Sequence, residues 1–215
     1  MKRMLLFQFC CFVLFNFFSQ DVNAQQSKFS RMAFGSCNRQ DAPQPLWNPI
    51  LADHPDLWVW MGDNIYGDSR NMDTLSAKYA RQNANPDYQV LKASTPLIGI
   101  WDDHDYGIND GGKNYAQKKA SRDLMFDFLN VPLDAPERKR EGGYSAHTYG
   151  AGEHQVKVIL LDGRYFRDTL SRVNRVYQIN ATGQILGDAQ WKWLENELEG
   201  LWVNSPTSLS FFLDF

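Results

Sequence analysis

Residues 57–68 read LWVWMGDNIYGD, an apolar run of five residues that passes directly into a polar cluster. A short apolar run that ends in turn-forming residues is typical of a buried β-strand. Gly62 allows a sharp turn, which directs the Asp63 carboxylate out of the sheet, and Tyr66 can return to the same side. The stretch therefore predicts a strand with a potential ligand at its end. The alternative is a plain hairpin turn rich in Asn, Gly and Asp.

Two other stretches repeat this pattern of an apolar run followed by a polar cluster. One continues from the run Arg31–Phe34 into Gly35-Ser36-Cys37-Asn38, and the other continues from Leu97–Trp101 into Asp102-Asp103-His104-Asp105. In layered α/β folds, ligands gather beyond the carboxyl ends of the strands. We therefore expect the three clusters to meet at one site.

The remaining periodic segments place strands and helices in alternation. Further strands are expected at Ser145–Tyr149 and Val156–Leu161, and helices at Asp73–Gln82, Tyr115–Leu129 and Asp188–Leu201. Because strands and helices are interleaved, the sequence predicts an α/β fold built in layers.

The amino terminus has the layout of a secretory signal peptide. Lys2 and Arg3 precede the apolar run Met4–Phe18, and a small-residue cleavage motif ends at Ala24. A membrane anchor is the alternative, but a spanning helix needs roughly 20 apolar residues, and this run is shorter and contains two polar residues. We expect residues 1–24 to be removed and the protein to be exported to the periplasm or the extracellular space.

Composition limits the classes of partner. A chain of 215 residues with 43% hydrophobic and 14% aromatic content can build one globular core. Loss of Lys2, Arg3 and Asp21 with the signal changes the net charge from −3 to −4, because +2 and −1 are lost together. A mildly acidic surface gives no electrostatic reason to expect nucleic acid or an anionic membrane as a partner.

Residue types in the three clusters indicate a metal site. Once the signal is removed, Cys37 is the single cysteine, and it is a buried apolar residue, an intermolecular link or a ligand. A bridging carboxylate such as Asp63, combined with a thiolate or a phenolate, suits a trivalent or softer transition metal such as iron.

The cluster at residues 102–105 carries more negative charge than can be buried away from water without bound cations. Three carboxylates and a histidine in four positions need solvent or bound cations near neutral pH. Asp103 is the best ligand candidate, and His104 can donate a proton to a leaving alkoxide. A solvated acidic loop is the alternative. An EF-hand calcium loop is excluded, since Gly107 and Asn114 stand where oxygen ligands belong.

The motifs together resemble those of the alkaline phosphatase D (PhoD-like) metallophosphatases. The matching segments are Phe34-Gly35-Ser36-Cys37, Gly62-Asp63 with Ile65-Tyr66, Trp101-Asp102-Asp103-His104-Asp105 and Leu161-Asp162-Gly163-Arg164. The resemblance continues to about residue 200, which gives a partial domain at residues 25–201.

This resemblance implies a metallophosphoesterase-like four-layer α-β-β-α sandwich that hydrolyses phosphate mono- or diesters of small molecules or lipids. It also implies ferric iron and calcium as cofactors. By this resemblance Cys37, Asp63 and Tyr66 hold the iron, with Asp63 bridging to calcium. Asp103 is a ligand of the second metal, and Asn109 or Asp110 provides the amide or acid that follows the site histidine, His104.

Arg164 follows the strand predicted at Val156–Leu161, so its planar guanidinium can reach the same end of the sheet and grip phosphate oxygens. The resemblance to the family favours that role. The alternative is an ordinary ion pair with Asp162 or Asp168.

The end of the chain departs from the family pattern. A Gly-Asp-x-His segment expected after a further strand is missing, and residues 202–215 do not resemble the family. We therefore interpret the domain as carboxy-terminally truncated, and expect a monomer that binds metal weakly and turns over poorly. Two other functions stay open. One is a non-catalytic, calcium-stabilised secreted binding module. The other is a two-carboxylate glycosidase, whose activity survives chelators.

Overall fold

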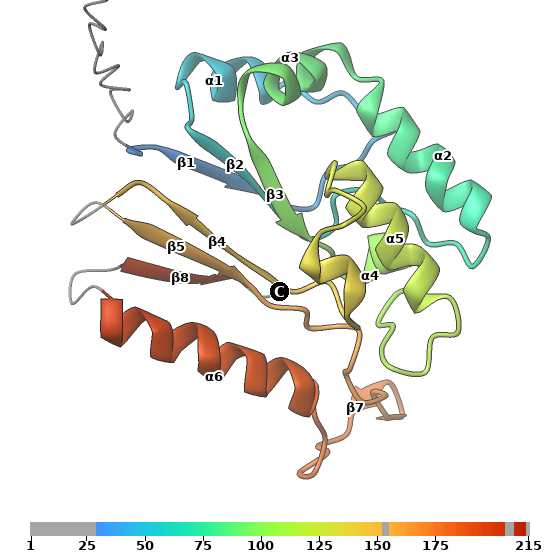
Figure 1. The fold of residues 1–215 in the computed structure, drawn as a ribbon. Helices are drawn as coiled ribbons and strands as arrows, with labels where there is room; N and C mark the ends of the chain where they lie inside the picture. Colours follow the sequence, from blue (N-terminus) through green and yellow to red (C-terminus); the bar gives the residue numbers. More distant parts are fainter. Residues whose placement is uncertain (1–28, 152–154, 205–208, 214–215) are drawn as a thin grey trace, which may run out of the picture.

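A computed structural model describes residues 29–151, 155–204 and 209–213 (Figure 1). The predicted signal peptide at residues 1–24 lies outside the described residues, as does part of the predicted non-family tail. Among the helices that the structure describes, none combines the length and the apolar character needed to cross a bilayer.

The first sheet is parallel and is built from the three strands that precede the polar clusters. Its order is β1 (Met32–Gly35), β2 (Leu57–Met61) and β3 (Leu97–Ile100). The crossovers contain α1 (Trp47–Ala52), then α2 (Met72–Asn83) and α3 (Pro86–Ser94). The three strands confirm the sequence prediction to within one residue at each end. Because they run in parallel, their carboxyl ends meet at one edge of the sheet.

The helices α1 and α3 were not predicted. Helix α1 has six residues, too few to show a helical period, and α3 is identified by its start, where the Asn85 side chain accepts a hydrogen bond from Tyr88 N and Pro86 follows.

An aromatic cluster fixes the helical layer on the first sheet. Trp58 and Trp60 of β2 stand on one face, where Trp47 lies 5.2 Å and 5.6 Å from them between ring centroids. Tyr88 of α3 lies 5.7 Å from Trp60, and Phe128 lies 6.1 Å from it. Every residue of β2 is buried, so its other face packs as well.

The second sheet contains β4 (Ser145–Tyr149), β5 (Val156–Leu160) and β8 (Leu209–Leu213), with β4 antiparallel and β8 parallel to β5. Helix α6 (Gly187–Asn204) lies along it on the side away from the first sheet (Figure 1). Successive side chains of β5 point to opposite faces of the second sheet. Val158 and Leu160 share the main core with the first sheet, whereas Ile159 packs with Leu194 of α6. The sequence predicted no element after Leu201, so β8 is an addition to the expected fold.

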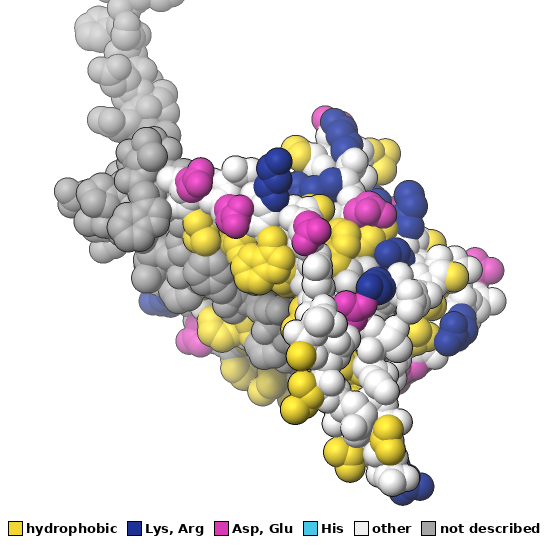
Figure 2. Space-filling view, turned by 90° about the horizontal axis from the view of Figure 1, so that it is seen from below, with side chains coloured by type: hydrophobic (Ala, Val, Ile, Leu, Met, Phe, Trp, Pro, Cys, Tyr) yellow, Lys and Arg dark blue, Asp and Glu magenta, His cyan; other side chains and the backbone are white. Residues whose placement is uncertain are grey.

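The remaining helices and strands are short. They are α4 (Asp103–Tyr106), α5 (Lys118–Phe128), the 3-10 helix η1 (Pro136–Lys139) and the hairpin β6 (Arg172–Val173) and β7 (Val176–Tyr177). Helix α5 is shorter than the predicted Tyr115–Leu129. The face seen in Figure 2 mixes acidic, basic and apolar side chains and shows no broad field of one sign.

The first prediction tests the role of β2 in the core. Leu57 is 0% exposed, so Leu57→Ala leaves a cavity and is expected to lower the free energy of unfolding by about 2–5 kcal/mol. The same change at Leu133, which is 85% exposed, is expected to cost less than about 0.5 kcal/mol. Urea denaturation measures both. Equal losses at the two positions would contradict the placement of β2.

The second prediction concerns acid sensitivity. Burial lowers the pKa of His147 on β4, so the unfolded chain takes up this proton more readily than the folded one. The unfolding free energy therefore falls as the pH drops from the ordinary histidine pKa to the lower folded value. Urea denaturation at pH 7.5 and pH 5 should show a smaller fall for His147→Gln than for the wild type. The same substitution at exposed His54 should leave the fall unchanged.

Candidate metal-binding site

Backbone turns at the ends of β1 and β2 bring the first two clusters together. Cys37 and Asp63 both have positive φ, at 54° and 49°, which is uncommon for residues with a side chain. The two turns are linked by the backbone, since Cys37 N donates to Gly62 O at 3.3 Å and Asn38 N donates to Asp63 O at 2.8 Å. Such conformations persist only where the surroundings enforce them, and they concentrate at functional sites.

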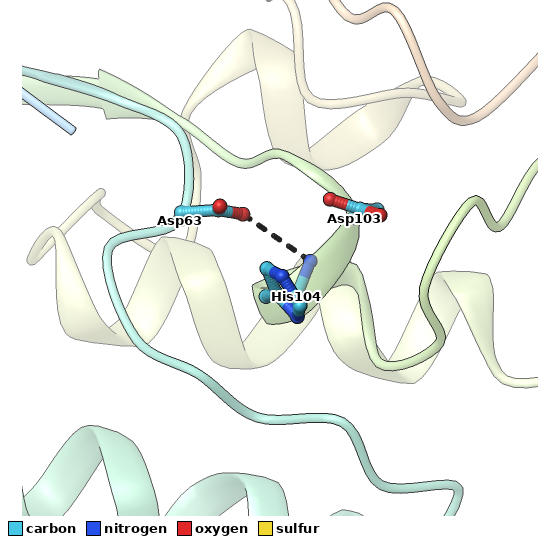
Figure 3. Close-up of side chains that lie close together, drawn as sticks. All are labelled: Asp63, Asp103 and His104. Carbon is cyan, nitrogen blue, oxygen red and sulfur yellow. Dashed lines mark hydrogen bonds between the residues drawn. The ribbon is translucent and has the colours of Figure 1, made fainter. Parts of the chain in front are cut away.

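Asp63, Asp103 and His104 form a candidate ligand group. Each offers one ligand atom, and these atoms all lie within 4.8 Å of one another. Figure 3 shows Asp63 approaching from β2 and the other two from α4, with the His104 backbone N–H donating to Asp63 Oδ1 at 3.3 Å. The Cys37 thiol lies beside them, with Sγ 3.8 Å from Asp63 Oδ2.

Tyr66 returns to the same site, as its spacing from Asp63 suggested. Its ring lies 4.3 Å from the His104 ring between centroids. Burial raises the pKa of the Tyr66 phenol, and the neighbouring charges of Cys37 and Asp63 raise it further. A bound cation would oppose these effects and favour the ionised phenolate.

His104 is held in place by Asp68, whose Oδ1 lies 2.7 Å from Nδ1. Burial by itself lowers the His104 pKa, but the hydrogen bond that the ring makes to Asp68 and the charges of Asp63, Asp68 and Asp103 outweigh it, so the pKa stands above its ordinary value. With Nδ1 engaged, Nε2 is the ring atom left for a substrate or a cation.

The negative charge of the carboxylates at the site is only partly compensated by Arg164 and His104. Burial raises the pKa of Asp63, and Asp102 and Asp103 raise it further, against the opposing effect of His104. Burial also raises the pKa of Asp102, although its bond to Arg164 opposes the change. Bound cations relieve such repulsion, so the donor set of carboxylates, thiol, phenol and imidazole fits a metal centre.

Arg164 enters this site from the second sheet. Its Nε donates to Asp102 Oδ1 at 2.6 Å, and its Nη2 lies 3.8 Å from Asp103 Oδ1. Its Nη1 is buried and has no hydrogen-bond partner within the described part of the chain. The alternative pairing with Asp162 or Asp168 is wrong for the guanidinium. Asp168 pairs with Lys113, and the contact of Arg164 with the Asp162 carboxylate is made by its backbone N–H.

Asp110, and not Asn109, contacts the ligand group. The Asp110 backbone N–H donates to Asp103 Oδ2 at 2.7 Å. The Asn109 side chain is exposed, and among the described residues it makes no hydrogen bond to this group. The assignment of Asn109 as a ligand remains a prediction.

Sequence reasoning missed the buried residues whose hydrogen bonds hold the backbone around the ligand group. Asp105 is fully buried and accepts hydrogen bonds from Asp102 N at 2.7 Å and Asn64 N at 3.1 Å. Asn64 in turn donates its amide to Ile100 O at 2.9 Å. The three-residue spacing of Asp102 and Asp105 matches a capping box at the start of α4, and that signal could have identified the buried role of Asp105.

Asp162 joins the site to both sheets. Its carboxylate accepts hydrogen bonds from Trp101 Nε1 at 2.9 Å, Gly143 N at 2.6 Å, and the backbone N–H groups of Arg164 and Tyr165, both at 2.9 Å. A fully buried carboxylate with this many donors fixes the turn that presents Arg164.

Comparison with known proteins points to one family. The family model described as PhoD-like phosphatase matches residues 32–201. A solved structure described as "Structure of PhoD" shares the fold, with a TM-score of 0.66 and 18% sequence identity. That match covers 85% of this chain and 40% of the PhoD chain. No curated protein matches the sequence.

The third prediction concerns proton competition at the ligand group. Since the pKa values of His104 and Asp63 are raised, protons bind them more tightly and oppose cation binding at low pH. Affinity for Mn²⁺ should fall about tenfold or more between pH 8 and pH 5.5, as measured by isothermal titration calorimetry. Asp103→Asn should weaken binding at both values, and Asp134→Asn, at an exposed carboxylate, should not. Binding that is independent of pH would contradict the site.

Proposed function

The chain belongs to the PhoD-like phosphatase family, and on that premise we propose that its site hydrolyses phosphate mono- or diesters with the help of bound metal ions. The chain spans about 40% of the PhoD structure that it resembles. The activity, the substrates and the complete four-layer sandwich of the whole protein are therefore part of the proposal.

The unpartnered guanidinium nitrogen of Arg164 carries this proposal. A buried cationic donor without an acceptor costs free energy, and phosphate oxygens match the fork of donors that it presents. A purely structural calcium site gains nothing from a buried arginine beside its carboxylates, because the two cations repel each other. This observation favours the enzyme over the calcium-stabilised binding module.

The donors divide into two groups that suit different metals. We assign the thiol of Cys37, the phenol of Tyr66 and the bridging carboxylate of Asp63 to ferric iron, and Asp103 to calcium, which prefers oxygen ligands. Metal ions bound here would polarise the phosphoryl group and lower the pKa of a bound water.

The residues of the chain supply the rest of the chemistry. Arg164 holds the non-bridging oxygens of the phosphoryl group and offsets charge that develops on them. His104, whose Nδ1 is held by Asp68, donates a proton to the leaving oxygen of the alcohol. Asp102 orients Arg164 through its 2.6 Å bond to Nε.

We also propose that the protein is exported to the periplasm or beyond, on the sequence pattern of residues 1–24. The expected substrates are small-molecule or lipid phosphate esters.

The fourth prediction separates the metal ligands from the phosphate grip. Asp63→Asn should lower metal content and should lower kcat/KM for p-nitrophenyl phosphate and its bis-ester by about a thousandfold or more. Arg164→Ala should keep the metal but lower kcat/KM by about a hundredfold and weaken the binding of inorganic phosphate. Arg138→Ala, remote from the site, is the matched control. Metal analysis, phosphate titration and steady-state kinetics provide the readouts.

Two results would contradict the proposal. Hydrolysis that survives complete removal of metal by a chelator would point to another mechanism, such as that of a glycosidase-like carboxylate pair. A purified protein that holds metal stoichiometrically, yet neither hydrolyses these esters nor binds inorganic phosphate, would support the binding module.

A further inference from the structure

The hairpin β6–β7 touches the site at the side chain of Asp110. Arg172 Nη2 lies 2.7 Å from Asp110 Oδ2, and the Tyr177 hydroxyl donates to the same oxygen at 2.6 Å. The guanidinium of Arg172 also stacks on the Tyr177 ring, with Cζ 4.0 Å from the centroid. The two side chains thus form one clamp, which we call the hairpin clamp. Figure 1 shows the hairpin projecting from the end of the molecule beyond the two sheets.

Asp110 connects the hairpin clamp to the ligand group through its own backbone. Its N–H donates to Asp103 Oδ2 at 2.7 Å, while its carboxylate points to the hairpin. Asp110 has a φ of 56°, in the left-handed region that Asp and Asn tolerate better than other residues with side chains. This conformation turns the N–H and the side chain toward different partners, so it needs support from both.

The two oxygens of Asp103 therefore have different neighbours. Oδ2 accepts the hydrogen bond from Asp110 N, and Oδ1 lies 3.8 Å from Arg164 Nη2. Partners of this kind fix the orientation of a ligand, and their loss commonly weakens metal binding by 10- to 100-fold.

We propose that Arg172 and Tyr177 are positioning residues for the metal site, acting through Asp110 on Asp103. The inference rests on the proposed function, because it assumes that Asp103 binds a cation. It assigns a role to a hairpin that carries no residue of the family motifs recognised in the sequence.

The hairpin clamp contributes little to the free energy of unfolding. Arg172 and Asp110 are partly exposed, with side-chain exposures of 50% and 30%. Hydrogen bonds and ion pairs at such positions contribute little to global stability. A purely structural role therefore predicts a small change in unfolding free energy and unchanged metal affinity. A positioning role predicts the same small change in unfolding free energy together with weaker metal affinity.

The hairpin itself is fixed by its turn. Asn174 and Arg175 have φ values of 51° and 66°, which matches a two-residue type I′ turn. Arg175 has no ion-pair partner among the described residues, so it serves as a control for Arg172 on the same hairpin.

The fifth prediction compares two matched double variants of the full chain. Arg172→Ala with Tyr177→Phe removes the hairpin clamp and should weaken Mn²⁺ binding about tenfold, measured by isothermal titration calorimetry. Arg175→Ala with Tyr149→Phe makes the same chemical changes away from Asp110 and should leave the affinity unchanged. Thermal unfolding of the metal-free proteins should show similar midpoints for both.

Variants of Asp110 provide an independent readout. Asp110→Asn keeps an acceptor and tolerates positive φ, so its Mn²⁺ affinity should lie between that of the wild type and that of Asp110→Ala. The proposal is overturned if the wild type binds Mn²⁺, Asp103→Asn abolishes binding, and the clamp variant binds as the wild type does. If the wild type binds no metal and hydrolyses no phosphate ester, the proposed function fails and this inference fails with it.

Discussion

The buried carboxylate of Asp162 ties the two sheets to each other at the edge where the site forms. It lies just after β5 on the second sheet and accepts the indole N–H of Trp101, which follows β3 on the first. Gln190 of α6 binds the Asp162 backbone through both its amide oxygen and its amide nitrogen, so the outer helix is joined to the same point. Asp162 is fully buried, and hydrogen bonds are electrostatically stronger in a low-dielectric interior than in water. The position of Arg164 relative to the carboxylates of α4 follows from this connection.

The site concentrates unfavourable features that the surrounding fold must enforce. Cys37 and Asp63 adopt uncommon backbone conformations, and Asp105 is buried close to other carboxylates. Burial raises the pKa of Asp105 well above its ordinary value, with the charges of Asp63 and Asp102 adding to the effect and two backbone N–H groups opposing it. Strain and repulsion of this kind are tolerated where a ligand relieves them, and bound cations are the species that would do so here.

The sequence predicted the parts of the fold that depend on local pattern. The strands of the parallel sheet were recognised from their short apolar runs and the outer helix from its apolar stripe. Asp63 and Cys37 were proposed as ligands because they lie two residues beyond the ends of such strands. It selected Asp103 as the ligand candidate within one run of acidic residues but gave Asp105 no role of its own. The buried position of Asp105 depends on the hydrogen bonds that its carboxylate accepts from Asp102 N and Asn64 N. The hairpin at residues 172–177 was missed because its strands have only two residues each. The contact of the Asp110 backbone N–H with Asp103 was likewise not foreseen, because the backbone of Asp110 has a positive φ that one sequence does not reveal.

The bond between Trp101 and Asp162 spans 61 residues of the chain, and this separation has a consequence during synthesis. Strands β1 to β3 can pair as soon as residue 100 has left the ribosome, but the face of β2 opposite the tryptophans finds its cover only when β5 emerges. At roughly 5–20 residues per second, about 60 residues take on the order of 3–12 s to appear. During that interval the nascent chain presents an apolar sheet face to its surroundings. The interval is long compared with the time in which a local α/β unit forms. Chaperones that bind exposed apolar surface would therefore encounter a partly synthesised chain in which β1, β2 and β3 are paired and the second sheet has not yet formed.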